Sequence, residues 1–279
     1  MMRNVVMFGL AALMSVGGAM TSAQAAPSVE RGDYLVNSIA GCGNCHTPLG
    51  PNGPEMDKAL SGRLVEQSDQ YTAIAPNLTP AGEIKDWTDA QLMKAIREGI
   101  RPDGKVLGPP MPFEVYKGLS DSDLSSIVMY LRTVPAVEND PGKSEYKIPL
   151  PPAWGPPITT VADVPEGVTV EYGAYLAGPM GHCTVCHTTF GPMGPMFETH
   201  LGQGGVEFPG PWGVSVSANI TPTGLAEFSD ADIAKMITTG TRPDGSAMLP
   251  PMPYGYYAHI KPDDVSAIIL YLRSLPPKP

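Results

Sequence analysis

Histidine and cysteine are scarce in this chain of 279 residues. Of the five histidines, only His46 precedes residue 182. The four cysteines form two close pairs, Cys42/Cys45 and Cys183/Cys186, and no cysteine is left over. A site built from the first part of the chain therefore cannot use two histidines or a third cysteine unless the second part contributes a ligand.

Positive charge is also in deficit. The chain has 18 Lys and Arg residues against 28 Asp and Glu residues, a formal net charge of −10. Without Arg3, the only charged residue before Glu30, the net charge becomes −11. This balance argues against nucleic acid as a partner and is compatible with a basic docking surface on another protein.

Long hydrophobic runs are absent after the first residues of the chain. The single run, residues 5–20, follows Arg3 and is succeeded by the small residues Ala23 and Ala25. This pattern is typical of an export signal with an A-x-A cleavage site, and glycines within the run disfavour an uncleaved membrane anchor. We therefore expect residues 1–25 to be a signal peptide, the mature protein to be periplasmic, and the mature chain to lack a membrane span.

An internal repeat covers most of the remaining sequence. At an offset of 141 residues, residues 101–104 align with 242–245, 110–112 with 251–253, and 130–132 with 271–273. A proline-rich stretch separates the two copies. We therefore predict two similar domains, residues 26–136 and 171–279, joined by a stiff, extended linker at residues 137–170.

The regular segments of both copies have helical periodicity. Two sets of apolar residues each fall on one helical face: Leu124, Ile127, Val128 and Leu131, and likewise Val265, Ile268, Ile269 and Leu272. A second helix in each copy begins with a capping signal, at Thr88 or Ser229, and ends near Gly99 or Gly240. Because strand patterns with a period of two are scarce, the predicted fold class is all-α.

Each cysteine pair is followed at once by a histidine, in Cys42-Gly-Asn-Cys45-His46 and in Cys183-Thr-Val-Cys186-His187. This spacing is the attachment pattern of c-type haem. Two thiols one helical turn apart can bond to the two vinyl groups on one edge of a porphyrin, which brings the adjacent imidazole under the iron. Two such motifs at matching positions of a repeat predict two covalently bound haem c groups, with His46 and His187 as iron ligands.

Three other interpretations compete with haem attachment. A disulfide is possible outside the cytoplasm, but it gives no reason for the histidine after each pair. A thioredoxin-like redox pair would need a βαβ setting, whereas the pattern here is helical. A zinc site is possible from the residue types alone.

The number of histidines in the first copy indicates the second iron ligand. His46 is the only histidine of the first copy, so its haem needs a methionine or an unusual ligand. Met111 and Met252 each lie between two prolines, sixty-five residues after His46 and His187 respectively. Flanking prolines remove backbone donors and fix φ, so the loop can hold a thioether stiffly. We therefore predict Met111 and Met252 as the distal ligands, although methionine is more often core filler.

The sequence now resembles class I cytochromes c. Tyr34 and Tyr175 fit the N-terminal helix of that family, which crosses a C-terminal helix bearing an aromatic residue, here Tyr130 or Tyr271. Residues 75–80, residues 87–89 and the Pro-Met111-Pro segment look like the cytochrome subunits of bacterial alcohol and gluconate dehydrogenases. Members of that group usually carry three haems, whereas this chain has two motifs.

The resemblance implies an electron-transfer protein that is not itself an enzyme. We expect it to accept electrons from an exported dehydrogenase and to pass them to an oxidase or a small cytochrome c. Ligation by histidine and methionine raises the haem potential and leaves no open iron position. The alternative is a di-haem peroxidase-like enzyme, in which the two haems would differ, whereas the repeat makes the two sites look alike.

Overall fold

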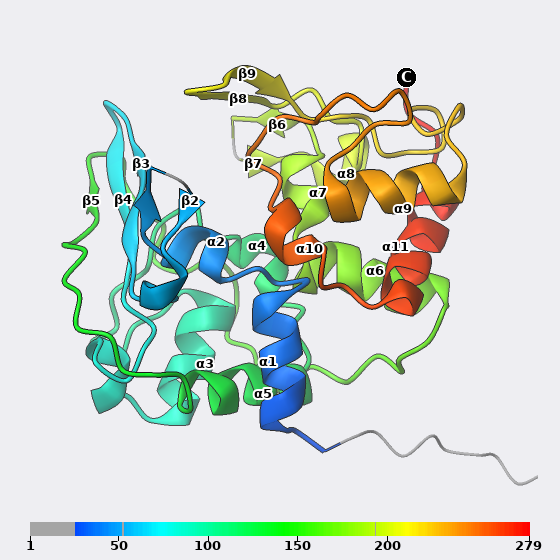
Figure 1. Ribbon diagram of the computed structural model, residues 1–279. Coiled ribbons are helices and arrows are strands. Elements are labelled where there is room, and N and C mark those ends of the chain that lie inside the picture. Colours follow the sequence, from blue (N-terminus) through cyan, green and yellow to red (C-terminus); the bar gives the residue numbers. More distant parts are fainter. Residues whose placement is uncertain (1–25, 52, 193) are drawn as a thin grey trace, which may run out of the picture.

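A computed structural model describes residues 26–51, 53–192 and 194–279 (Figure 1). The predicted signal peptide lies outside these residues. The helices in this part of the chain are α1 (Val29–Asn37), α2 (Gly43–His46), η1 (Met56–Lys58), η2 (Glu83–Asp86), α3 (Asp89–Glu98), α4 (Phe113–Tyr116), α5 (Asp121–Leu131), α6 (Val170–Tyr175), the π-helical turn η3 (Leu176–Met180), α7 (Cys183–Cys186), α8 (Phe197–His200), α9 (Asp230–Thr239), α10 (Tyr254–Tyr257) and α11 (Pro262–Ser274). None of them has the length and apolar character that crossing a bilayer needs.

The expectation of an all-α fold is wrong, because the described residues also contain four small antiparallel sheets. Their strands are β1 (Leu49–Gly50), β2 (Gly53–Pro54), β3 (Arg63–Gln67), β4 (Tyr71–Ala75), β5 (Glu145–Tyr146), β6 (Phe190–Gly191), β7 (Gly194–Pro195), β8 (Glu207–Gly210) and β9 (Gly213–Val216). The pairs are β1–β2, β3–β4–β5, β6–β7 and β8–β9. The longest strands have five residues, so an alternation with a period of two has too few positions to be visible in the sequence.

The elements of residues 29–136, the first half, recur in the same order in residues 170–279, the second half. Helices α1, α2, α3, α4 and α5 correspond to α6, α7, α9, α10 and α11, and both halves carry two hairpins. The division of the chain into two domains at the predicted boundaries stays a prediction, because the buried side chains of the two halves belong to one hydrophobic cluster.

The first and last helices of each half cross at a glycine. A β-carbon added to Gly32 of α1 would lie 1.9 Å from the carbonyl oxygen of Ser126 in α5. The matching Gly173 of α6 has the same distance, 1.9 Å, to the carbonyl oxygen of Ala267 in α11. Only a residue without a side chain lets these backbones approach so closely, and the predicted helix crossing is confirmed.

The helix ends follow the predicted capping signals. Thr88 and Ser229 each complete a capping box with the third residue of α3 and α9. Both helices end at a glycine in the left-handed region, Gly99 with φ 65° and Gly240 with φ 63°. The apolar stripes of α5 and α11 are buried as expected.

An arginine ties the last helix of each half to the loop before α3 or α9. Arg132 donates through Nη1 to the carbonyl of Ile84 at 2.5 Å and through Nη2 to that of Trp87 at 2.6 Å. Arg273 makes the matching bonds to Leu225 at 2.8 Å and Phe228 at 2.5 Å. These bonds satisfy loop carbonyls and explain why Tyr-Leu-Arg recurs in the sequence.

The two halves meet along a seam made of reciprocal hydrogen bonds. The phenol of Tyr34 in α1 donates to Asp264 of α11 at 2.5 Å, and the matching Tyr175 donates to Asp123 of α5 at 2.8 Å. Each phenol oxygen also accepts a backbone N–H from the other half, from Lys261 at 3.1 Å for Tyr34 and from the matching Ser120 at 3.3 Å for Tyr175. Because matched positions exchange partners, the halves are related by approximate two-fold symmetry.

The proline-rich segment between the halves lies against the first half. Its strand β5 adds to β4, with Tyr71 opposite Tyr146. Further along, the Trp154 ring stacks on Phe113 with a centroid distance of 5.8 Å, and its indole N–H donates to the carbonyl of Leu107 at 2.8 Å. The hairpin β8–β9 of the second half forms a two-stranded sheet without a third strand in the described chain.

Candidate functional site

The first Cys-x-x-Cys-His segment forms one helical turn, α2, that begins after Cys42. The backbone N–H of His46 donates to the carbonyl of Cys42 at 3.0 Å, so the side chains of Cys42 and Cys45 lie about one turn apart. Both thiols are free, and burial raises the pKa of Cys42 to about 12. Two free, half-buried thiols at this spacing suit bonding to one porphyrin edge.

The imidazole of His46 is oriented by a backbone carbonyl from another segment. Its Nδ1 lies 2.9 Å from the carbonyl oxygen of Pro76. Burial lowers the pKa of His46 to about 4, so the ring is neutral and the Nδ1 proton is the one donated to the carbonyl. The lone pair is then on Nε2, which is the arrangement of a metal-ligating histidine with its outer hydrogen bond in place.

The second segment repeats this geometry. The N–H of His187 donates to the carbonyl of Cys183 at 3.0 Å, and its Nδ1 lies 2.8 Å from the carbonyl oxygen of Ala218. Burial raises the pKa of Cys183 to about 12 and lowers that of His187. The carbonyls of Pro76 and Ala218 were not found by sequence reasoning, although they stand directly before matching residues in the two copies.

The two segments lie near each other across the seam. The pKa of Cys186 is raised to about 11, first by burial and then by the negative charge that Cys45 of the other half would carry as a thiolate. The two candidate sites are therefore neighbours in space although Cys45 and Cys186 are far apart in the sequence. The packing of the two halves along the seam sets the position of one site relative to the other.

The predicted methionines sit on matching tight turns. The N–H of Phe113 donates to the carbonyl of Met111 at 2.9 Å, and the N–H of Tyr254 donates to that of Met252 at 3.0 Å. Between them, Pro112 has φ −84° and ψ 64°, the angles of an inverse γ-turn. Both methionine side chains are partly buried against the core. Their assignment as iron ligands stays a prediction.

The Nε atom of Arg63, beside the first segment, is buried and has no hydrogen-bond partner among the described residues. Arg63 lies next to the segment, since its Nη2 donates to the carbonyl of Asn44 at 2.8 Å. A buried guanidinium N–H without an acceptor fits a bound group that carries a carboxylate. The residues present therefore fit a haem, whose propionates are such acceptors.

Arg63 was missed by sequence reasoning because the repeat does not contain it. The N–H of Gly62 donates to the carbonyl of His46 at 2.7 Å, and the N–H of Gly204 donates to that of His187 at 2.8 Å. These two bonds align Arg63 with Gly205, so the second half has no counterpart of this cation. Arg101, in a loop that the repeat does contain, binds Glu83 through two contacts of 2.8 and 2.6 Å.

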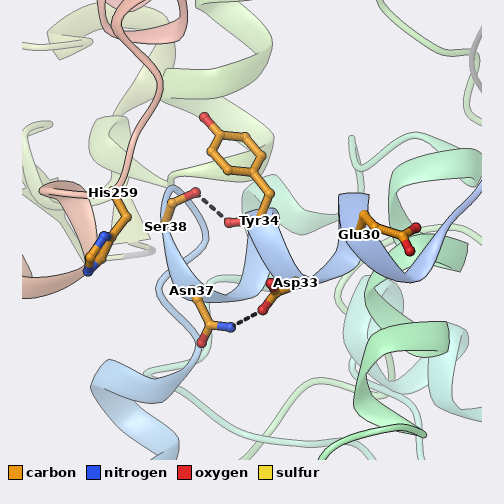
Figure 2. A pocket seen from close by; sticks show the side chains of 6 residues that line it. All are labelled: Glu30, Asp33, Tyr34, Asn37, Ser38 and His259. Atoms are coloured by element: carbon orange, nitrogen blue, oxygen red, sulfur yellow. Dashed lines mark hydrogen bonds between the residues drawn. The ribbon is translucent and has the colours of Figure 1, made fainter.

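Two of the remaining histidines lie at the contact between the halves. His182 precedes Cys183 with φ 43°, and its ring meets Tyr116 of the first half edge-on at a centroid distance of 6.0 Å. His259 is exposed and lines an open pocket at the seam with residues of α1, among them Ser38 and Asn37 (Figure 2). The Tyr34 ring rises from the same helix toward the second half (Figure 2).

The zinc alternative finds no support in the described residues, where no three His, Cys, Asp or Glu side chains gather in a way that could hold a metal ion. Each candidate site offers a single imidazole and two thiols that suit covalent attachment. The remaining iron ligands would come from the porphyrin and from a methionine.

Residues 29–135 match the cytochrome c family. Most of the chain is similar to three curated proteins. It is 31% identical to the fructose dehydrogenase cytochrome subunit of Gluconobacter japonicus, covering 90% of this chain and 53% of that protein. It is 30% identical to the cytochrome c subunit of the quinone alcohol dehydrogenase of Gluconobacter oxydans, covering 96% and 59%. It is 29% identical to a diheme cytochrome c-type protein of Cereibacter sphaeroides, covering 85% and 82%.

The chain thus spans little more than half the length of the two dehydrogenase subunits and most of the diheme protein. These matches confirm the resemblance to cytochrome c subunits of dehydrogenases that the sequence motifs indicated.

Proposed function

Because residues 29–135 belong to the cytochrome c family, we propose that this chain is a periplasmic electron carrier with two covalently bound haem c groups. Cys42 and Cys45 attach the first haem, and His46 is its proximal iron ligand. Cys183, Cys186 and His187 do the same for the second haem. The protein is not itself a catalyst.

The matched imidazole hydrogen bonds carry this proposal. A histidine placed one helical turn after a cysteine could point anywhere, yet both rings direct Nδ1 to a backbone carbonyl, at 2.9 and 2.8 Å. This bond leaves Nε2 free for iron and holds the ring plane. A diheme relative that the chain covers to 82% supports a count of two haems.

Met111 and Met252 are the proposed distal ligands. The support is their matched tight turns and their partial burial. When bound, each haem supplies an iron that takes up and releases one electron. The residues of the chain would supply a histidine and a methionine to each iron, and the thioether would favour the ferrous form.

Two closed sites favour a carrier over the peroxidase-like alternative, which needs an open iron position at one haem. The proposed donor is an exported dehydrogenase, because relatives are named as cytochrome subunits of fructose and alcohol dehydrogenases. The proposed acceptor is a respiratory oxidase or a small cytochrome c. A net charge of −10 would suit docking to a basic partner surface.

The test is kinetic. Protein reduced with dithionite should be reoxidised rapidly by an oxidase or a small cytochrome c and slowly by hydrogen peroxide or oxygen. The matched control is a Met252→Ala variant, in which one iron position is opened and the reaction with peroxide should increase. Rapid turnover of the unmodified protein with peroxide, or a high-spin haem at rest, would replace the carrier by the peroxidase-like enzyme.

A further inference from the structure

The loop that carries each methionine continues into the haem-attachment region of the other half. Helix α10 begins two residues after Met252, and its Tyr256 lies against the first attachment segment, whereas helix α4 begins two residues after Met111 and packs against η3, just before the second. In Figure 1, α10 lies at the boundary between the halves. The methionine loop of each half is thus connected, through the seam, to the attachment region of the other half.

Tyr256 is in close contact with the first segment. A β-carbon at Gly43 would lie 2.2 Å from Oη of Tyr256 and 2.8 Å from its Cζ. A β-carbon at Gly41 would lie 3.6 Å from Cβ of the same tyrosine. The tyrosine therefore lies against the backbone on both sides of Cys42, and a side chain at position 43 would require the end of the Tyr256 side chain to move.

The matching positions of the other half have exchanged sizes. The repeat aligns Tyr256 with Val115, Gly43 with Thr184 and Gly41 with His182. The large Tyr256 on α10 thus goes with two glycines in the first half. The smaller Val115 on α4 goes with two larger residues, Thr184 and His182, in the second half. In an otherwise symmetric seam, such compensation indicates that Tyr256 and Gly43 fit each other specifically.

The environment of Tyr256 gives this contact a polar component. Tyr256 is only 9% exposed, and its hydroxyl lies beside Gly43 and the hydroxyl of Thr47. Gly43 and Asn44 are the two residues between the attachment cysteines. A buried hydroxyl dipole that touches this turn adds to the field at the first site, and Val115 offers no such dipole to the second.

We propose that Tyr256 is a positioning residue for the first haem. From the second half, it holds the turn that contains Cys42, Cys45 and His46, so the first iron site depends on the loop that follows Met252. This inference rests on the proposed attachment of haem to these cysteines. It makes the two sites unequal, because Val115 does not perform the same role for the second haem.

The primary test compares Tyr256→Val, which introduces the residue of the other half, with Tyr254→Val on the same helix. Tyr254 packs within its own half, where a β-carbon at Gly240 would lie 2.7 Å from its ring. The readouts are the two reduction potentials and the hyperfine-shifted proton resonances of each oxidised haem. Met111→Ala and Met252→Ala, which each alter one set of resonances, assign the sets to the first and second haem.

Tyr256→Val should shift the potential and the resonances of the first haem, and Tyr254→Val should change only those of the second. Tyr256→Phe should keep the resonances near their original positions, because the ring stays, while the loss of the hydroxyl shifts the potential. The inference is overturned if Tyr256→Val leaves the first haem unchanged or shifts both haems equally.

A compensating pair provides the second test. Gly43→Ala alone should reduce attachment of the first haem or shift its resonances, because the new methyl group collides with Tyr256. Adding Tyr256→Val should restore attachment and return the resonances to those of Tyr256→Val alone, and equal effects of Gly43→Ala with and without it would contradict the inference. Intact mass is measured first. A wild-type protein without two haems would refute the proposed function, whereas two haems with no response at the first would refute only the role of Tyr256.

Discussion

The two halves hold their candidate sites with the same contacts but surround them with different charges. In both halves a histidine is oriented by a carbonyl, at Pro76 and Ala218, and a methionine sits on a tight turn. By contrast, Arg63 beside the first segment aligns with Gly205 in the second half. The shared contacts are those that haem attachment needs, whereas the charges that differ make the two sites distinct.

The seam between the halves likewise combines shared hydrogen bonds with different charges. The tyrosine–aspartate bonds are reciprocal, but Asp123 also pairs with Arg31 at 2.8 Å, and the repeat places Tyr172 where Arg31 stands. Arg31 reaches Glu166 at 3.1 Å as well. One end of a symmetric interface is therefore an ionic network, whereas at the other end Tyr34 binds Asp264 and the backbone N–H of Lys261 through hydrogen bonds alone. A duplicated structure can thus become unequal through a few side chains.

Removing the cysteines of either half should have the largest effect. The double change Cys42→Ala and Cys45→Ala should remove one haem from the intact mass, and Cys183→Ala with Cys186→Ala should remove the other. Each variant should keep one set of c-type absorption bands. Retention of both haems in either variant would show that the cysteines are not the attachment points.

The methionines should give the next largest effect. Met111→Ala or Met252→Ala should abolish the iron–sulfur absorption of one haem and lower the potential of that haem, because a ligand that favours the ferrous form is lost. Met129→Ala, at a partly exposed position on α5, is the control and should change neither. An unaltered spectrum in Met111→Ala would point to Met93 or Met56 as the ligand.

The two seam aspartates should differ in their effect on stability. Asp123→Ala leaves the mostly buried Arg31 without its close partner and should lower the free energy of unfolding by about 3–5 kcal/mol. Asp264→Ala removes mainly one hydrogen bond and should cost about 1–2 kcal/mol. Urea unfolding of the haem-loaded protein measures both, with the exposed Asp57→Ala as control. Equal costs would mean that the ionic network adds nothing to the symmetric bonds.

The smallest effect should be a dependence on pH at Asp264. Burial raises the pKa of this carboxyl above its ordinary value of 3.8, opposed by Tyr34, Arg31 and Lys261. The folded state therefore holds the proton more tightly than the unfolded state. This stabilising contribution is present below pH 3.8 and is lost as the pH rises through the raised pKa.

Asp264→Asn should remove that dependence. Over this range, the free energy of unfolding of the wild type should fall relative to that of the variant, as measured by urea unfolding at a series of pH values. Parallel curves for the two proteins would contradict the raised pKa.

Local signals account for the parts of the fold that the sequence predicted correctly. Helices α3, α5, α9 and α11 were found because caps and apolar stripes lie within each helix, and a capping box needs only residues three positions apart. The strands were missed because hairpins of two to five residues carry too little alternation, and the third strand β5 comes from the proline-rich segment.

The sequence by itself determined the chemistry of each site, because Cys-x-x-Cys-His places two thiols and an imidazole within one helical turn. Tertiary structure alone decided how these groups are surrounded. The carbonyls that orient His46 and His187 come from about thirty residues away, Arg63 comes from a neighbouring strand, and Tyr256 comes from the other half. Such contacts depend on the packing of distant segments, which no local pattern encodes.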